Sequence, residues 1–404
     1  MDSNLTNLRV NRDTTRNQNM KGRRITNAAP SQSPSDYVTR SELDKLAGGG
    51  TIQRTVVFQG TPGPKGDKGA FSSFHVPGEI ENIFLQTLAY GEGYIHATEC
   101  ALGYIWLGLV IDIYFNGPGK LIKMDPLNPS SYQVLTFPND GNHQGLLDLH
   151  YIASKNKIYC LFCNHSSVFL SEVDPNTLTY TDVIADTISG HVTYEGSFCY
   201  DSTYCYIACA GDSPSMLLRY SLTTWGIPTV LTLSFSGKDL LLSHNCRHDG
   251  TNIFISSCNN DLVTYLAFVC VDPITYTVTD GASLPINTNA IITDDSTFTS
   301  LYVWYGSELS GNIIRVLKSN LSSQTVISMG VGASCYGAYF DGTYIWGIFN
   351  TSPGKLIRIR TTDLSLYTFT FDPGQDYPNE MLQDTNGTFY FTFWQDPAKV
   401  SAAT

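Results

Sequence analysis

The chain has 404 residues, of which 42% are hydrophobic and 12% aromatic, so it holds enough apolar material for a large core and is not wholly disordered. Its formal net charge of -12 disfavours a nucleic-acid binder, because contacts with phosphates need clustered Lys and Arg. The longest apolar run, residues 101–111, is short of the roughly 20 residues that span a bilayer, and residues 1–20 lack the apolar core of a secretory signal. We therefore expect a soluble protein with no nucleic-acid partner and no membrane insertion.

Charge and aromatic residues are distributed unevenly along the chain. Residues 1–70 contain 11 Lys/Arg and 6 Asp/Glu, a net of +5, which leaves -17 for residues 71–404. Tyr37 and Phe58 are the only aromatic residues before residue 71, and all 10 cysteines come later. This shift predicts a boundary near residue 70, between a core-poor N-terminal segment and one large aromatic-rich body.

The N-terminal segment begins with a polar stretch and continues into a short predicted helix. Residues 1–34 show neither a helical nor a strand period, so alone they would bury too little apolar surface to offset the entropy of ordering. Ser35 is a candidate N-cap for a helix that carries Leu43 and Leu46 and ends at residues 48–50, GGG. A helix this short is marginal in isolation, so we expect it to need a partner.

Two stretches of this segment, KGRRITNAAP at 21–30 and SDYVTRSEL at 35–43, resemble a sequence found ahead of the receptor-binding part in many bacteriophage tail-fibre proteins. The resemblance departs from that pattern in the Ser-rich residues 31–35. It implies that residues 1–50 attach the chain to other structural proteins of the virion. The attachment residues that it implies are Arg23, Arg24, Ile25, Tyr37, Val38 and Leu43.

Residues 60–69 read GTPGPKGDKG, with a glycine at every third position. Three such chains can wind a collagen triple helix, because only glycine fits at the crowded axis. The trimerising glycines would be Gly60, Gly63, Gly66 and Gly69. The alternative is a flexible Gly/Pro-rich linker. Short collagen-like inserts are frequent in the phage fibres that the N-terminus resembles, so we expect residues 51–70 to combine linker and triplets in a homotrimer.

The large body contains a repeat of about 47 residues. The run PGKLIK at 118–123 recurs as PGKLIR at 353–358, 235 residues later, and weaker copies divide the gap into five intervals. A second landmark, DGTYIW at 341–346, is a turn followed by a strand with an aromatic residue, and related runs occur at the same mean spacing. The aromatic residues of this second landmark are Trp106, Tyr159, Tyr206, Phe254, Trp304, Trp346 and Tyr390.

Short strands rich in Tyr, Ile, Val and Thr lie between the landmarks, punctuated by Asp-Gly, Asn-Gly and Pro-Gly turns, with no helical period. Four strands per 40–50 residues are typical of a β-propeller blade. The sequence therefore predicts an all-β fold, a seven-bladed β-propeller over residues 71–404, with six blades as the alternative. Only 14 residues follow Tyr390, so we expect residues 71–90 to supply the two outer strands of the last blade.

The cysteines and one histidine cluster could suggest metal or disulfide chemistry. Cys160 and Cys163 have CxxC spacing, but they fall inside a predicted strand with no second CxxC. We expect the cysteines to be reduced, buried and used as small apolar residues. The run HNCRH at 244–248 offers three possible metal ligands, and we interpret it as polar loop residues.

The sequence lacks the common motifs of hydrolytic enzymes. The chain has no GxSxG elbow and no HExxH helix, and its Asp-Gly turns lack the Ser-x that opens sialidase boxes. Asp125, Asp174 and Asp272 repeat with the blade, which predicts that they form turns, because a catalytic pair would be unique in the ring. We therefore expect a protein that is not an enzyme, with no catalytic residue, cofactor or metal.

Tryptophans divide into core and candidate contact residues. Trp106, Trp304 and Trp346 share one position of the repeat and Trp394 follows the last landmark, so all four are expected in the core. Trp225 lies at a turn and is a candidate contact for a sugar, with packing of an edge strand as the alternative. The insert at 304–311 adds Tyr305 and Glu308 as candidate receptor or glycan contacts, since loops carry variable recognition surfaces.

The order of segments resembles that of a phage fibre. It implies a virion fibre protein, assembled in the host cytoplasm, whose N-terminus is anchored to the particle and whose propeller binds a host-surface receptor or glycan. A capsid fibre and a purely structural virion protein remain open alternatives. A third alternative is a glycan-degrading propeller on the same stalk, because a propeller alone hosts both enzymes and binders.

Overall fold

The computed structural model describes residues 82–89, 92–110, 117–163, 167–186, 196–209, 215–235, 238–240, 242–258, 266–283, 297–299, 301–306, 311–330, 334–384, 386–394 and 399–403. All of them belong to one compact unit, Ser72–Thr404. The expected attachment segment (1–50) and the collagen-like stretch (51–70) lie outside the described residues. No helix in the described residues is long and apolar enough to cross a membrane.

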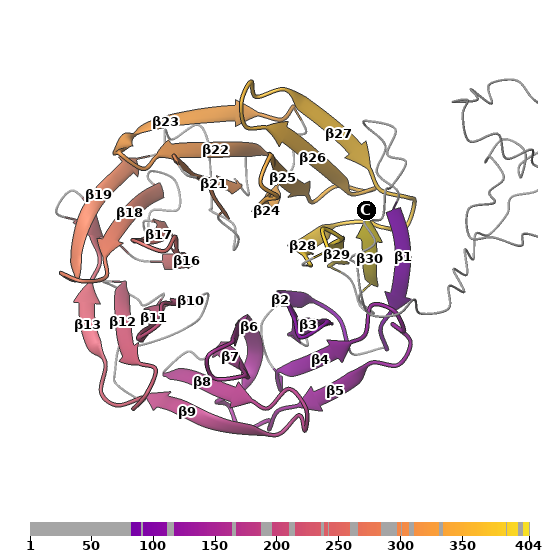
Figure 1. The fold of residues 1–404 in the computed structure, drawn as a ribbon, viewed down its shortest axis with the longest axis horizontal. Helices are drawn as coiled ribbons and strands as arrows, with labels where there is room; N and C mark the ends of the chain where they lie inside the picture. The colour runs from indigo at the N-terminus through magenta and orange to yellow at the C-terminus, as the bar shows by residue number, and fades with distance from the viewer. Residues whose placement is uncertain are drawn as a thin grey trace, which may run out of the picture. The chain divides into compact units, whose positions relative to one another are not determined.

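The described strands form seven four-stranded antiparallel sheets and one two-stranded sheet. Viewed down the ring, the seven sheets are blades arranged around a centre, with the first strand of each blade innermost (Figure 1). The predicted all-β fold and the count of seven blades are confirmed.

Blades 1 to 3 follow one another without interruption by other strands. Blade 1 comprises β2 (Ile95–Ala101), β3 (Tyr104–Leu109), β4 (Lys120–Met124) and β5 (Gln133–Thr136). Blade 2 comprises β6 (Gln144–Ile152), β7 (Lys157–Cys163), β8 (Val168–Val173) and β9 (Tyr180–Asp186). Blade 3 comprises β10 (Ser197–Tyr200), β11 (Tyr204–Cys209), β12 (Met216–Ser221) and β13 (Thr229–Thr232).

Blades 4 to 6 come after an inserted hairpin of β14 (Ser234–Phe235) and β15 (Lys238–Asp239). Blade 4 comprises β16 (Leu242–His248), β17 (Ile253–Cys258), β18 (Leu266–Asp272) and β19 (Thr277–Ser283). Blade 5 comprises β20 (Thr297–Phe298), β21 (Tyr302–Gly306), β22 (Asn312–Leu317) and β23 (Asn320–Ser328). Blade 6 comprises β24 (Cys335–Phe340), β25 (Tyr344–Phe349), β26 (Lys355–Arg360) and β27 (Leu366–Thr370).

Both ends of the propeller sequence build blade 7, which closes the ring. Its strands β28 (Pro378–Gln383), β29 (Phe389–Phe393) and β30 (Lys399–Ala403) come from the C-terminal end, and β1 (Asn82–Thr87) adds the outermost strand (Figure 1). Closure from both ends was expected, but the N-terminal side supplies one outer strand and not two. The expectation failed because only five residues, 394–398, separate β29 from β30 in the sequence. The 14 residues after Tyr390 are therefore enough to include a third strand of the blade.

The 47-residue period corresponds to one blade. All seven landmark aromatics, from Trp106 to Tyr390, fall in the second strand of their blades. The two PGKLI copies, at 118–122 and 353–357, lead into third strands, β4 and β26. Trp106, Trp304 and Trp346 are buried, as predicted.

The hydrophobic core is divided among the interfaces between neighbouring blades. One cluster joins blades 1 and 2 around Trp106 and Phe162, and another joins blades 6 and 7 around Trp346 and Phe391. Polar contacts span the same interfaces. Lys123 of blade 1 lies 4.2 Å from the ring centroid of Tyr104 and donates to a backbone carbonyl of blade 2, that of Pro175, at 2.6 Å. Each blade is therefore stabilised by its neighbours.

The repeated aspartates form turns, as the sequence predicted. The Oδ1 atoms of Asp125, Asp174 and Asp272 each accept a hydrogen bond from the backbone N–H two residues later, at 2.8, 2.9 and 2.7 Å. These are Asx turns between the third and fourth strands.

Candidate functional site

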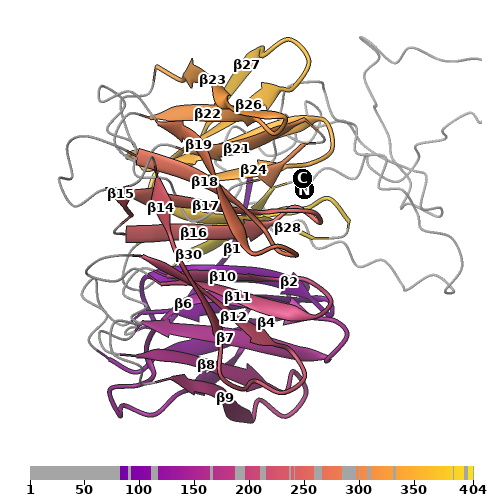
Figure 2. The same cartoon turned by 90° about the vertical axis from the view of Figure 1, so that its left-hand side faces the viewer.

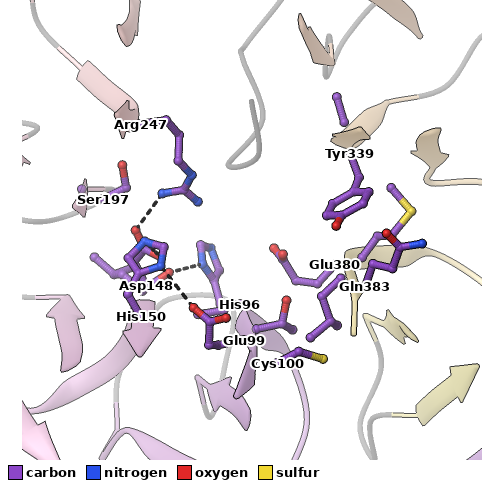
Figure 3. A pocket seen from close by; sticks show the side chains of 17 residues that line it. His96, Glu99, Cys100, Asp148, His150, Ser197, Arg247, Tyr339, Glu380 and Gln383 are labelled. Atoms are coloured by element: carbon purple, nitrogen blue, oxygen red, sulfur yellow. Dashed lines mark hydrogen bonds and ion pairs between the residues drawn. The ribbon is translucent and has the colours of Figure 1, made fainter. Parts of the chain in front are cut away.

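A cavity of about 340 Å³ lies where the first strands of the blades meet around the central channel. Six blades contribute to it, through β2, β6, β10, β16, β24 and β28. Figure 3 shows Arg247, Asp148, His150 and Glu99 on one side of this cavity and Tyr339, Glu380 and Gln383 on the other.

Five of the lining residues share a position in the repeat. Each of the five lies opposite the landmark aromatic of its own blade, across the hairpin of the first and second strands. The pairs that line the cavity in this way are Glu99 with Trp106, His150 with Tyr159, Arg247 with Phe254, Tyr339 with Trp346 and Leu382 with Tyr390. These residues carry no motif that singles them out in the sequence. Counting seven to nine residues back from each landmark would have found them.

Asp148 is a buried carboxylate held by three donors. Its Oδ2 accepts from Nη1 of Arg247 at 3.2 Å and from the backbone N–H of Phe198 at 3.0 Å, and its Oδ1 accepts from the N–H of Leu149 at 2.9 Å. Arg247 belongs to blade 4 and Asp148 to blade 2, so the ion pair reaches past blade 3. A buried charge requires such pairing, which fixes both side chains in the channel wall.

His150 lies between two carboxylates and a carbonyl. Its Nε2 is 3.0 Å from the carbonyl oxygen of Phe198 and 3.6 Å from Oδ1 of Asp148, and its Nδ1 is 3.5 Å from Oε2 of Glu99. Burial has the largest effect and lowers the pKa of His150. Asp148 and Glu99 together outweigh burial and the opposing charge of Arg247, so the pKa is raised overall. Carbonyl and carboxylate oxygens only accept hydrogen bonds, so these contacts favour a protonated His150 imidazolium that donates from both of its nitrogens.

The opposite side of the cavity offers neutral and acidic hydrogen-bonding groups. Burial, followed by Asp341, raises the pKa of Tyr339, so its hydroxyl stays a donor at neutral pH. Gln383 and Glu380 add an amide and a carboxylate. In the part of the chain that the structure describes, no cluster of His, Cys, Asp and Glu could hold a metal ion.

An aromatic cluster adjoins the cavity through His96, which lines it. Trp394 is half-buried and lies 6.2 Å from the His96 ring, 6.0 Å from Tyr94 and 6.1 Å from Tyr336, between centroids. The expectation that Trp394 is a core residue is therefore wrong. It follows the end of β29 and lies at the rim, with rings from blades 1, 6 and 7.

The candidate contact residues from the sequence fall away from this cavity. Trp225 is half-buried in the turn between β12 and β13, and its ring lies 5.4 Å from that of Tyr159 against the core between blades 2 and 3. Its surroundings match the alternative of packing at the blade edge. Tyr305 is in β21, but its side chain lies outside the described residues, as does Glu308.

The implied attachment and trimerisation residues also lie outside the described residues. They are Arg23, Arg24, Ile25, Tyr37, Val38, Leu43, Gly60, Gly63, Gly66 and Gly69.

The histidine and cysteine runs occupy strands. The segment 244–248 was interpreted as a polar loop, and this is wrong, because it forms the end of the innermost strand β16 and brings Arg247 into the channel. Cys160 is buried in β7, where burial raises the pKa of its thiol and keeps it unreactive. The eight cysteines whose side chains the structure describes form no disulfide, although the sulfurs of Cys199 and Cys246 lie 3.3 Å apart on consecutive blades.

Comparisons with known proteins identify the fold alone. No family model matches the sequence, and no curated protein matches it. Among solved structures, virginiamycin B lyase from Staphylococcus aureus superposes with a TM-score of 0.59 at 12% identity, covering 81% of this chain and 99% of that one. The extracellular domain of the putative hybrid two-component system BT4673 from B. thetaiotaomicron superposes with a TM-score of 0.55 at 12% identity, covering 81% of this chain and 42% of that one. The computationally designed Ika8 protein superposes with a TM-score of 0.51 at 11% identity, covering 79% of this chain and 99% of that one. At these identities the likeness shows the arrangement of blades alone.

Proposed function

We propose that this chain is a bacteriophage virion fibre protein, of the tail or the capsid, whose propeller adheres to the host surface. The observation that supports the proposal is the order of its segments. A stretch resembling the attachment region of tail fibres (21–43) precedes collagen-like triplets (60–69), and these precede a propeller. Since β1 closes the ring, the propeller forms a complete head joined to the preceding residues by a single stretch of chain.

Adhesion would work through multivalency. A trimer held by the triplets presents three heads, and the second and third binding events become intramolecular. A weak site on each head then suffices for firm attachment. Other virion proteins would bind residues 1–50, and the head would contact a host receptor or glycan.

The charges in the channel favour binding over bond cleavage. The carboxylates of Asp148 and Glu99 are engaged by Arg247 and His150, and the repeated Asp side chains form turns. These groups stabilise the ring, and the remaining polar groups of the cavity can donate to or accept from a ligand.

Two measurements test the proposal. Light scattering of the full chain should give three times the monomer mass of 44.5 kDa, and antibodies against the propeller should label projections on purified phage particles. A monomeric mass would count against the trimeric fibre. If the antibodies do not label the particles, or label only a smooth shell without projections, the proposal of a virion fibre is overturned. Release of reducing ends from host polysaccharide would instead support the glycan-degrading alternative.

A further inference from the structure

Trp394 lies on the face of the propeller opposite the one where the chain enters it. In blade 7, Ala403 at the end of β30 pairs with Asn82 at the start of β1 on one side and with Phe389 at the start of β29 on the other. The chain therefore enters beside the turn that precedes β29, and Trp394 follows the far end of that strand. Figure 2 shows the ring edge-on, with the C-terminus on one face and the hairpin β14–β15 on the other.

Two of the strained backbone positions of the propeller lie on the Trp394 face. In the described residues, eight non-glycine residues have a positive φ, a conformation that disfavours side chains with a Cβ. Six of them are in recurring turns on the face where the chain enters, namely Leu102, Asn156, Leu178, Trp225, Tyr276 and Leu364.

The other two are tyrosines on the Trp394 face. Tyr94 (φ 52) directly precedes β2, and Tyr377 (φ 57) directly precedes β28. The backbone carbonyl of Tyr377 accepts a hydrogen bond from the backbone N–H of Trp394 at 2.8 Å, and the ring of Tyr94 is 6.0 Å from that of Trp394. Strain of this kind persists where the surroundings hold it, often at binding sites.

The rings of Tyr94, His96 and Tyr336 pack around Trp394 beside the polar cavity, and the exposed Tyr377 is joined to Trp394 through its backbone carbonyl. Tyr377 is 47% exposed, and Tyr94, Tyr336 and Trp394 are half-buried, so the rings are accessible at the surface. His96 contacts Trp394 and also lines the cavity. We name this set, Tyr94, His96, Tyr336, Tyr377 and Trp394, the aromatic rim.

We infer that the aromatic rim and the channel cavity together bind a neutral pyranose sugar of the host surface. The C–H face of a pyranose stacks on aromatic rings. Its hydroxyls need hydrogen-bonding partners nearby, such as the side-chain amide of Gln383 and the phenolic hydroxyl of Tyr339. Three carboxylates face the cavity (Glu99, Asp148 and Glu380), against one guanidinium and two imidazoles. This balance disfavours an anionic sugar at neutral pH. The inference rests on the proposed adhesion and assigns it a face, a site and a ligand class.

Tyr377→Gly separates binding from folding. Glycine adopts a positive φ without steric cost, so the variant should keep the fold while it loses an exposed ring. Leu102→Gly is the matched control, because Leu102 also has φ 57, is 48% exposed and lies on the opposite face. Methyl glycosides of glucose, galactose and N-acetylglucosamine, and of N-acetylneuraminic acid as the anionic probe, would be titrated into the full-length protein and followed by saturation-transfer NMR.

At least one neutral glycoside should bind, with affinity reduced about fivefold or more in Tyr377→Gly and unchanged in Leu102→Gly. Equal losses in both variants, no loss in either, or no binding of any neutral glycoside would overturn the site. Tighter binding of the anionic probe would overturn the ligand class. Since the titration uses free sugar, its failure is independent of whether the chain is found on a virion.

Discussion

The carboxylate Oδ2 of Asp341 accepts a hydrogen bond from the indole Nε1 of Trp346 at 2.6 Å. Its Oδ1 accepts from the backbone N–H groups of Thr343 at 2.8 Å and Tyr344 at 2.7 Å. One side chain thus closes the turn between the first two strands and anchors the landmark aromatic of the second. The same arrangement occurs between Asp201 and Tyr206, at 2.7 Å, and between Asp384 and Tyr390, at 3.1 Å.

Blade 5 lacks this anchor, so Thr299→Asp should stabilise it. Trp304 corresponds to Trp346, but Thr299 stands five residues before it, and Nε1 of Trp304 is buried without a hydrogen-bond partner in the described residues. An aspartate there should raise the free energy of unfolding by about 1 kcal/mol, measured in urea. In the Trp304→Phe background the gain should vanish. An equal gain there would show that the indole is not the cause.

Asp341→Asn tests the anchor where it exists. The asparagine carbonyl can still accept the two turn hydrogen bonds, but its amide cannot accept from the indole of Trp346. The free energy of unfolding should fall by about 1 kcal/mol, and Asp341→Ala should cost more because the turn bonds are also lost. If the asparagine variant unfolds like the original chain, the indole contact adds nothing.

The aromatic anchors explain why the fold could be predicted from the sequence. The second strand of every blade carries a buried aromatic residue at the landmark position, and in blades 3, 6 and 7 a turn aspartate anchors it. Trp346 and its counterparts therefore mark the second strand of each of the seven blades. Closure of the ring was predicted less well. The outermost strand of blade 7, β1, comes from the opposite end of the propeller sequence to β28, β29 and β30, so it does not follow them at the spacing of the repeat.

The channel could not be predicted in the same way. Glu99, His150, Arg247 and Tyr339 share a position in their blades, but each is a different residue type. A repeat search compares residue types and so passes over them. The rim around Trp394 combines blades 1, 6 and 7, which are distant in sequence and meet only because the ring closes.

Removing one member of the channel ion pair should be costly. Arg247→Met leaves the Asp148 carboxylate, whose side chain is 10% exposed, without its guanidinium, and unfolding should become easier by about 3 kcal/mol. Adding Asp148→Asn should restore part of the loss. Lys157→Met is the control, because the Lys157–Asp174 pair lies at 2.9 Å with both side chains near 30% exposed, and breaking it should change little. Similar losses in both single variants would contradict the role of burial.

His150 should make stability depend on pH. Its pKa is raised in the folded state above the ordinary 6.5, so it stabilises the fold fully below that value and loses this contribution as the pH rises through the folded pKa. His150→Gln should therefore be less stable than the original chain in acid, with the difference shrinking above 6.5. Unfolding in urea across this range measures it. A difference that is constant with pH would mean that the imidazole acts through packing alone.

The outermost strand of blade 7 should be needed for cooperative unfolding. A chain starting at Ser72 keeps β1, which pairs with β30 from Asn82 to Thr87 and brings Leu85 and Leu88 to the core between blades 7 and 1. A chain starting at residue 89 loses these contacts and exposes the edge of β30. Calorimetry should show one sharp transition for the first chain and a lower, broader one for the second. If both melt alike, three strands suffice to close the ring, and β1 serves only to connect the head to the residues before it.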